Sequence, residues 1–524
     1  MRPQPLHAST HRPPHLALAV SFPAFAFATL CALGLLGHPT QAHAQSPDGL
    51  PASVLQALQR AKVPPEAMAV VVQNPSGQQT RLRWNAQQPM NPASVVKLVT
   101  TLAALETLGP SWTWRTPVWL DGPIENPGAD GVLQGHPHLK GSGDPKLTIE
   151  RIWALLQRIR SHGVKDIRGD IVLDQSAFAA PASPPGEFDG ESLRPYNVQA
   201  RALMLNQRTV TYHFVPDLAR GVARVLAEPE LQGVKVDATV PLASGPCDDW
   251  RGQLKANFAD PNRVRFSGRY LGTCGPQQWP VAYPDPAGYD ARLLQAMWLG
   301  MGGTLTGTVR EGPAPAKPPT FEWHSPPLSD VVRDINKFSN NTMAQQLALS
   351  WAGEQAPSLG RSATAAAQPP ASSGITAEQA REALQQWAQA RLGGTGLRID
   401  NGSGLSRDQR LSADQVAALL RHAWASPVLP ELMASLPVAG ATDGTLRRLQ
   451  QAAGRAHLKT GSLRDVVAVA GYALGRSGQR WIVVVLIHHD QAQAARPALE
   501  ALVQWAIQDE PPASIRTNLP NARP

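Results

Sequence analysis

"NPASVVKLVT" (residues 91–100) opens an apolar run that holds one lysine, a single helical turn after a serine. The run continues to Gly109-Pro110, a pair that ends helices. Its apolar residues fall on more than one face, which is typical of a buried helix. A lysine is rarely buried without a partner or a task, and residues three apart share a helix face. The stretch therefore predicts a buried helix on which Lys97 touches Ser94.

A structural reading explains the same stretch. Ser94 would cap the helix, and Lys97 would extend its stem along apolar surface while its charge reached water. A Ser-x-x-Lys motif occurs about once by chance in a chain of this length. Two later motifs favour chemistry instead, namely Ser339-Asn340-Asn341 and Lys459-Thr460-Gly461.

The first two motifs supply a nucleophile and a path for its proton. A serine hydroxyl reacts poorly until a base takes its proton. Lys97 can be that base only if burial or a nearby cation lowers its pKa, and Lys459 would be the cation if the motifs converge. Ser339 can pass the proton to a leaving amine, and the carboxamide of Asn341 can hold a peptide group.

The third motif suits substrate binding at the end of a strand. Lys459 and Thr460 together offer a cation and a hydroxyl to a substrate carboxylate. Gly461 allows a ligand backbone to lie close to the strand. The main-chain N–H groups of Ser94 and Ser462 would form an oxyanion hole.

These motifs, in this order, are those of penicillin-binding proteins and class A β-lactamases. The chain resembles the penicillin-binding protein 4 family of D-alanyl-D-alanine carboxypeptidases and endopeptidases, serine peptidases of the S13 type. Four further stretches carry the likeness: "LKGSGDPKLT" (139–148), "IRGDIVLDQSAF" (167–178), "RPYNVQARALMLN" (194–206) and "DNGSGLSR" (400–407). The resemblance covers about residues 50–505.

The resemblance implies removal of terminal D-alanine from peptidoglycan peptides, cleavage of D-alanyl cross-links, and acylation of Ser94 by penicillin, with no cofactor. It also implies a pocket for the substrate's diamino-acid side chain, built from Asp174, Phe178 and Arg407. Asp174 could equally be a strand-end turn residue, and Arg407 a surface charge. The chain departs from relatives at Arg464, where they often carry a neutral polar residue, and at Gln345, which replaces an acid.

Two other functions fit the same motifs. A β-lactamase would need an efficient deacylating water, and no glutamate in a recognisable loop supplies one. A non-catalytic cell-wall scaffold would keep the fold without the chemistry, but all three motifs are intact. A zinc peptidase is disfavoured because His136 and His138 lack further ligands at a fitting distance, so we expect no metal site.

The order of patterns predicts an α+β fold. We expect a penicillin-binding/β-lactamase-like transpeptidase domain, an antiparallel sheet flanked by helices, formed by residues 45–111 and 288–510. A large β-rich inserted region would occupy residues 112–287, and a disordered tail residues 511–524. The first hairpin, near residues 67–86, would share one sheet with the two apolar strands near the C-terminus.

The N-terminus predicts export. Residues 1–44 combine a basic start, an apolar middle and Ala42-His43-Ala44, the pattern of a secretory signal peptide cut near Ala44; a retained membrane anchor is the alternative. The two cysteines that remain, Cys247 and Cys274, would form one disulfide in an oxidising compartment. We therefore expect a periplasmic protein.

Charge bears on partners rather than on fold. The formal net charge of +8 falls to +6 without Arg2 and Arg12, and the remaining cations are spread along the chain. Nucleic acid is a poor fit for an exported protein without a basic block beside aromatic residues. Loose contact with an anionic wall or membrane surface fits the sign better; the sequence leaves the oligomeric state unknown.

Overall fold

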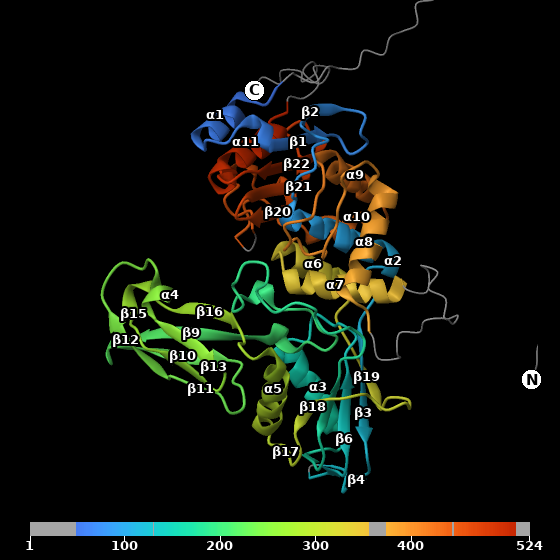
Figure 1. The fold of residues 1–524 in the computed structure, drawn as a ribbon, viewed down its shortest axis with the longest axis vertical. Coiled ribbons are helices and arrows are strands. Elements are labelled where there is room, and N and C mark those ends of the chain that lie inside the picture. The colour runs from blue at the N-terminus through green and yellow to red at the C-terminus, as the bar shows by residue number, and fades with distance from the viewer. Residues whose placement is uncertain (1–48, 129, 356–373, 443–444, 510–524) are drawn as a thin grey trace, which may run out of the picture. The chain divides into compact units, whose positions relative to one another are not determined.

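A five-stranded antiparallel sheet joins the two ends of the described chain in this computed structural model, which describes residues 49–128, 130–355, 374–442 and 445–509 (Figure 1). In order across the sheet, the strands are β2 (Thr80–Trp84), β1 (Met68–Gln73), β22 (Arg480–His488), β21 (Val466–Leu474) and β20 (Ala456–Leu463). Met68 pairs with Ile487, which confirms that the first hairpin and the last strands share one sheet.

Each face of this sheet packs against helices. Successive side chains of the central strands point to opposite faces, so each strand contributes to two cores. Val70 and Val485 face one core, with α1 (Ala52–Arg60) and α11 (Arg496–Ile507). Val71 faces the other core, which is covered largely by helices. Those helices are α2 (Lys97–Leu108), α6 (Leu328–Lys337), α7 (Asn341–Gln355), α8 (Ala377–Leu392), α9 (Ala413–Trp424) and α10 (Leu429–Ser435).

Helix α2 is the centre of the helical layer. Its positions from Lys97 to Leu105 are all buried, as the apolar run predicts. It follows directly on a short 3-10 turn, η2 (Ala93–Val96), that carries Ser94. The helix ends at Gly109, whose φ of 84° lies in the left-handed region that glycine adopts readily.

The inserted segment forms four further sheets with their own core (Figure 1). The first two are β18 (Val309–Glu311), β8 (Ile171–Asp174), β6 (His136–Lys140), β3 (Arg115–Asp121) and β19 (Phe321–His324), and then β17 (Thr304–Leu305), β7 (Asp166–Ile167), β5 (Val132–Leu133) and β4 (Ile124–Glu125). The others are β15 (Tyr270–Leu271), β12 (Thr239–Ala243), β10 (Val222–Glu228), β9 (Thr209–Asp217) and β16 (Gln277–Ala282), and then β11 (Lys235–Val236), β14 (Arg263–Phe266) and β13 (Ala256–Asp260). Its helices are α3 (Ile149–Ser161), α4 (Trp250–Gln253) and α5 (Pro286–Gly300).

The inserted segment extends further than the sequence pattern indicates. Strand β19 pairs with β3, and β18 pairs with β8. Trp298 of α5 is buried in the core of the inserted segment. The paired strands of the segment thus continue to His324, beyond the boundary expected at residue 287, because a short strand's local pattern does not identify its partner.

Cys247 and Cys274 form the expected disulfide, with their Cα atoms 5.0 Å apart. The expected signal peptide, residues 1–44, and the expected tail, residues 511–524, lie outside the described residues. Within the described ranges, no helix is both long and apolar enough to cross a membrane.

Candidate active site

The turn that carries Ser94 is fixed by hydrogen bonds before α2 begins. Asn91 is buried, and its side-chain oxygen accepts a hydrogen bond from the Ala93 N–H at 2.9 Å. Its side-chain nitrogen donates to the carbonyl of Ser406, also at 2.9 Å. Ala93 adopts a φ of 46°, an uncommon conformation for a residue other than glycine. Backbone strain of this kind persists where the surrounding structure enforces it.

Two glycines let neighbouring segments close on this turn. A Cβ atom at Gly461 would lie 2.5 Å from the carbonyl oxygen of Pro92, and one at Gly404 would lie 2.5 Å from that of Ala93. Strand β20 and the loop that carries Gly404 can therefore approach Ser94 only as glycine backbone. The sequence reading gave Gly461 to a ligand backbone, whereas its closest neighbour here is the Ser94 turn.

Lys97 joins the first motif to the second. Its Nζ lies 2.9 Å from Ser94 Oγ and 2.7 Å from Asn341 Oδ1, and it also donates to the carbonyl of Ser403. An amide oxygen and a carbonyl can only accept hydrogen bonds, whereas a hydroxyl can donate one. When Lys97 is neutral, its two N–H groups satisfy the two acceptors. Its lone pair is then left for the proton of Ser94.

Electrostatics favours that neutral state. Complete burial lowers the pKa of Lys97 well below its usual value, and the positive charge of Lys459 lowers it further. Burial also lowers the pKa of Lys459, to about 7. Both lysines therefore hold their protons far less strongly than a lysine in water.

A second serine–lysine pair faces the first. Lys459 Nζ lies 2.9 Å from Ser339 Oγ and donates to the Thr460 carbonyl at 2.8 Å. Ser339 lies between α6 and α7 with a φ of 57°, in the left-handed region. The Met343 N–H donates to Asn340 Oδ1 at 3.0 Å, which fixes the turn that holds Ser339. The three motifs thus meet at one place.

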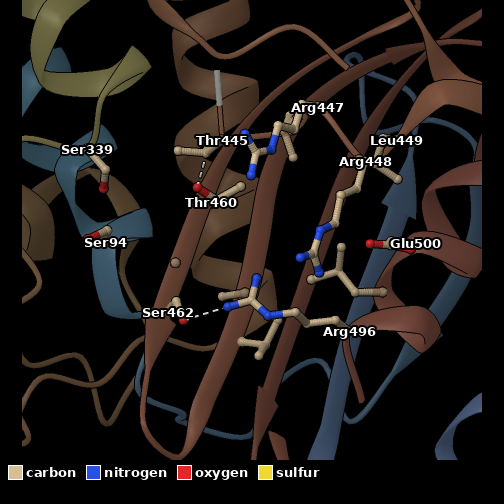
Figure 2. Close-up of a pocket in the computed structure, with 15 residues that line it drawn as sticks. Ser94, Ser339, Thr445, Arg447, Arg448, Leu449, Thr460, Ser462, Arg496 and Glu500 are labelled. Atoms are coloured by element: carbon tan, nitrogen blue, oxygen red, sulfur yellow. Dashed lines mark hydrogen bonds between the residues drawn. The ribbon is translucent and has the colours of Figure 1, made fainter. Parts of the chain in front are cut away.

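Several of the motif residues line one side of a pocket of about 590 Å³ (Figure 2). Ser94, Ser339, Thr460, Gly461 and Ser462 all line it. In Figure 2, the two serine side chains lie beside the edge of β20, and Thr460 lies on the strand itself, next to Thr445. The site therefore lies along the exposed edge of β20.

Two further residues contact the hydroxyls of Thr460, in the third motif, and of Ser462, which follows that motif. Thr460 Oγ1 donates to Thr445 Oγ1 at 2.9 Å. Arg496, at the start of α11, donates from Nη2 to Ser462 Oγ at 2.9 Å. Sequence reasoning missed Thr445 and Arg496 because neither lies in a motif.

The residues assigned to a side-chain pocket lie outside this pocket. Asp174 is buried, and its carboxylate accepts hydrogen bonds from the N–H groups of Ser176 and Ala314, at 2.8 and 2.9 Å. Burial alone would raise its pKa, but these hydrogen bonds and the charge of Lys140 hold the pKa below its usual value. Its place among substrate contacts stays a prediction.

Phe178 and Arg407 lie where the inserted segment meets the helical layer. Phe178 is buried and pairs with Ile375 in an isolated bridge. The guanidinium carbon of Arg407 lies 4.8 Å from the ring centre of Phe188. Both residues therefore lie at this junction, and their contact with substrate also stays a prediction.

The two departures from the family pattern have different surroundings. Gln345 donates to Ser403 Oγ at 3.3 Å, so it supports the loop whose carbonyl contacts Lys97. Arg464 is exposed just after β20. Ser403 itself lies in the "DNGSGLSR" stretch. Its contact with Lys97 is made by the backbone carbonyl, which every residue type has, so the sequence does not reveal this contact.

The two histidines weighed for zinc have other neighbours. His136 Nδ1 accepts a hydrogen bond from the Asp170 N–H at 2.9 Å, and His138 Nε2 lies 3.9 Å from Asp121 Oδ2. Among the described residues, no three histidine, cysteine or acidic side chains are grouped closely enough to hold a metal ion.

A serine beside a lysine of lowered pKa, with a second serine–lysine pair opposite, defines a class of serine acyl-transfer enzymes. Residues 50–509 match the family model described as the D-Ala-D-Ala carboxypeptidase 3 (S13) family. The chain belongs to this family and is a serine-type D-Ala-D-Ala carboxypeptidase. The family expected from the motifs is confirmed.

Curated relatives agree with this assignment. The chain is 29% identical over 437 residues to the D-alanyl-D-alanine carboxypeptidase of Actinomadura sp. (strain R39), covering 78% of this chain and 75% of that protein. It is 25% identical over 419 residues to the D-alanyl-D-alanine carboxypeptidase DacB of Haemophilus influenzae, covering 77% of this chain and 82% of that protein.

Solved structures confirm the expected α+β fold. The crystal structure of penicillin-binding protein 4 from Haemophilus influenzae covers 87% of this chain and 99% of its own, with a TM-score of 0.67 and 22% identity. The same protein in complex with a novel β-lactam gives a TM-score of 0.63, covering 86% of this chain and 99% of its own at 22% identity.

Proposed function

We propose that this chain is a serine D,D-peptidase of peptidoglycan stem peptides. It removes terminal D-alanine, cuts D-alanyl cross-links, and is acylated by penicillin and other β-lactams. The single observation that carries the proposal is the placement of Lys97 Nζ, 2.9 Å from Ser94 Oγ and in contact with two groups that can only accept hydrogen bonds. The β-lactam complex of the Haemophilus influenzae protein supports the expected inhibitor class.

The chemistry proceeds through an acyl-enzyme. Lys97 takes the proton of Ser94 Oγ, and the oxygen forms a bond to the carbonyl carbon of the penultimate D-alanine. The N–H groups of Ser94 and Ser462 stabilise the oxyanion. The C–N bond then breaks, and the proton taken up by Lys97 passes through Ser339 to the leaving amine, so that Lys97 is neutral again and Ser339 keeps its hydroxyl. Water hydrolyses the ester and restores the Ser94 hydroxyl.

Substrate binding falls to the remaining motif residues. Lys459 and Thr460 hold the carboxylate next to the scissile bond, because they bring a cation and a hydroxyl to the strand edge. Asn341 holds a peptide group of the substrate through its amide nitrogen, while its oxygen contacts Lys97 at 2.7 Å. Asp174, Phe178 and Arg407 contact the diamino-acid side chain on the acyl side.

The compartment is part of the proposal. The protein is exported to the periplasm, the signal peptide is removed near Ala44, and its basic surface can contact anionic wall polymers. The disulfide between Cys247 and Cys274 supports an oxidising compartment. N-terminal sequencing of protein from a periplasmic fraction tests this, and a chain that retains residues 1–44 there would contradict the cleavage.

Intact-mass measurement after incubation with benzylpenicillin tests the chemistry. The full chain should gain the mass of one penicillin, on the peptide that contains Ser94, and Ser94→Ala should gain none. We expect slow release of the adduct, together with release of D-alanine from a pentapeptide and cleavage of a cross-linked peptide dimer.

Other outcomes identify the alternatives. An adduct on Ser339 would refute the assignment of the nucleophile. Rapid turnover of penicillin would identify a β-lactamase. An unmodified chain that cleaves neither peptide would identify a scaffold without activity.

A further inference from the structure

The pocket beside Ser94 continues into a basic surface. Besides the motif residues, the described part of its lining holds three arginines, Arg447, Arg448 and Arg496, and a single acid, Glu500. Figure 2 shows the three guanidinium groups over β20 and its neighbouring strand, on the side away from the two serines. The lining thus carries an excess of positive charge that the chemistry at Ser94 does not use.

Two of the arginines project from a loop that is fixed at both sides. Leu446 and Leu449 are buried in the core that holds α11, whereas Arg447 and Arg448 between them are exposed. The Leu449 N–H donates to the Leu446 carbonyl at 3.0 Å, and Gln450 donates to the carbonyl of Arg447 at 2.6 Å. Packing and hydrogen bonds therefore hold the backbone of both arginines beside the pocket.

These two arginines differ from Arg496 in their partners. Arg496 donates to Ser462 Oγ and to Gln493 Oε1, at 2.9 and 2.7 Å. Among the described residues, neither Arg447 nor Arg448 has a carboxylate within ion-pair distance. Arginine presents a planar fork of N–H groups that matches a carboxylate. Their charge is therefore available to an anionic ligand.

The position of Thr460 indicates which part of a substrate this surface meets. Thr460 lines the same pocket, and the proposed function assigns it to the carboxylate next to the scissile bond. Any part of the substrate peptide that continues beyond that carboxylate belongs to the leaving group. The residues assigned to the acyl side, Asp174, Phe178 and Arg407, are not among the described residues that line this pocket.

We propose that Arg447 and Arg448 form a subsite for a leaving peptide that carries further carboxylates. This inference rests on the proposed function and refines it: the site favours cleavage of a cross-link, which releases an anionic peptide, over release of free D-alanine. A pocket of about 590 Å³ has the size of a typical ligand site. Free D-alanine is far smaller and brings only one carboxylate.

Three substrates test the subsite in the full chain. They are a stem pentapeptide, a D,D-cross-linked peptide dimer, and the same dimer with the additional carboxylates of its leaving peptide amidated. For the parent, kcat/KM for the charged dimer should exceed that for the amidated dimer by about tenfold or more, because charge-assisted hydrogen bonds are lost. This preference should weaken as ionic strength rises.

The double variant Arg447→Gln/Arg448→Gln should lower the ratio of kcat/KM for the charged dimer to that for the pentapeptide by about tenfold or more. It should also abolish the preference for the charged over the amidated dimer. Arg60→Gln/Arg476→Gln is the matched control, since it removes the same charge from two exposed arginines of α1 and the β21–β22 turn. The control should leave both ratios unchanged.

Two results overturn the inference in different ways. If the parent cleaves all three substrates and the double variant keeps its preference for the charged dimer, the subsite is refuted and the proposed function stands. If the parent forms no acyl-enzyme with benzylpenicillin and cleaves no peptide, the proposed function fails, and the subsite fails with it.

Discussion

Lys97 Nζ lies 2.7 Å from Asn341 Oδ1, although the two residues are 244 positions apart in the chain. This contact determines how a neutral Lys97 is oriented. With one N–H directed at Asn341 and another at the Ser403 carbonyl, the lone pair can take the proton of Ser94. The second motif therefore helps to orient the base as well as to bind substrate.

Replacing Lys97 by arginine should abolish most acylation. A guanidinium stays protonated at working pH and cannot act as a base, so the rate of acylation by benzylpenicillin should fall by about 10²–10⁴-fold. The acylation rate of Lys97→Met should fall by a similar factor, and this variant places no larger side chain in the buried site. Lys235→Arg, at an exposed position of β11, is the control. Acylation near the parent rate in either Lys97 variant would contradict the role of base.

The pH profile should depend on whether the substrate has a carboxylate. Lys459, with a pKa of about 7, is a cation below that pH and neutral above it. As pH rises through about 7, kcat/KM for a pentapeptide should therefore fall relative to that for an ester without a carboxylate, since kcat/KM reports groups of the free enzyme. At acid pH both should fall, because protonated Lys97 cannot accept the proton of Ser94.

Lys459→Arg provides the comparison for the pH profile, because arginine keeps its charge across this range. In this variant the ratio of the two kcat/KM values should stay constant through pH 7. Parallel profiles for ester and pentapeptide in the parent would show that Lys459 does not hold the carboxylate.

Gly461→Ala should disable the site without unfolding the sheet. The new Cβ would lie 2.5 Å from the Pro92 carbonyl, so β20 or the Ser94 turn must shift. A displacement of about 1 Å can cost about 10²-fold in rate, and overpacking costs about 1–3 kcal/mol of stability. We expect acylation to fall at least about tenfold with a modest loss in the unfolding midpoint. Gly300→Ala, with no atom within 4 Å of the new Cβ, is the control. If Gly461→Ala is acylated at the parent rate, the close approach of β20 to the Ser94 turn is not needed for activity.

Local sequence patterns predicted the helices and strands of the fold better than the boundaries between its parts. The hairpin of β1 and β2, the buried α2 and the paired helices α6 and α7 follow from apolar periodicity and turn residues. The sequence pattern assigned residues 288–324 to the peptidase domain, whereas their strands pair, and Trp298 packs, with the inserted segment. The pattern of α5 shows that one face is apolar, but only the packing of Trp298 shows which core that face enters.

The residues brought together at the site were predictable where chemistry requires a particular residue type. Ser94, Lys97, Ser339 and Lys459 fall in motifs, and the structure brings them together. Contacts made through the backbone, such as that of the Ser403 carbonyl with Lys97, cannot be predicted in this way, because every residue type has the same carbonyl group. The roles of Thr445 and Arg496 were also hidden, since each depends on a partner that only the folded sheet brings near.

The pairing of Met68 with Ile487 has a consequence for how the protein folds. Strand β1 is made early in synthesis, but its partner β22 emerges only near the end. Contacts of such long sequence separation make folding slow, because loop closure must precede their gain. The inserted segment has its own core and can form meanwhile, whereas the sheet that supports Ser94 is complete only when the last strands arrive. A chain that stops before β22 has every catalytic motif and still lacks the central strand of that sheet.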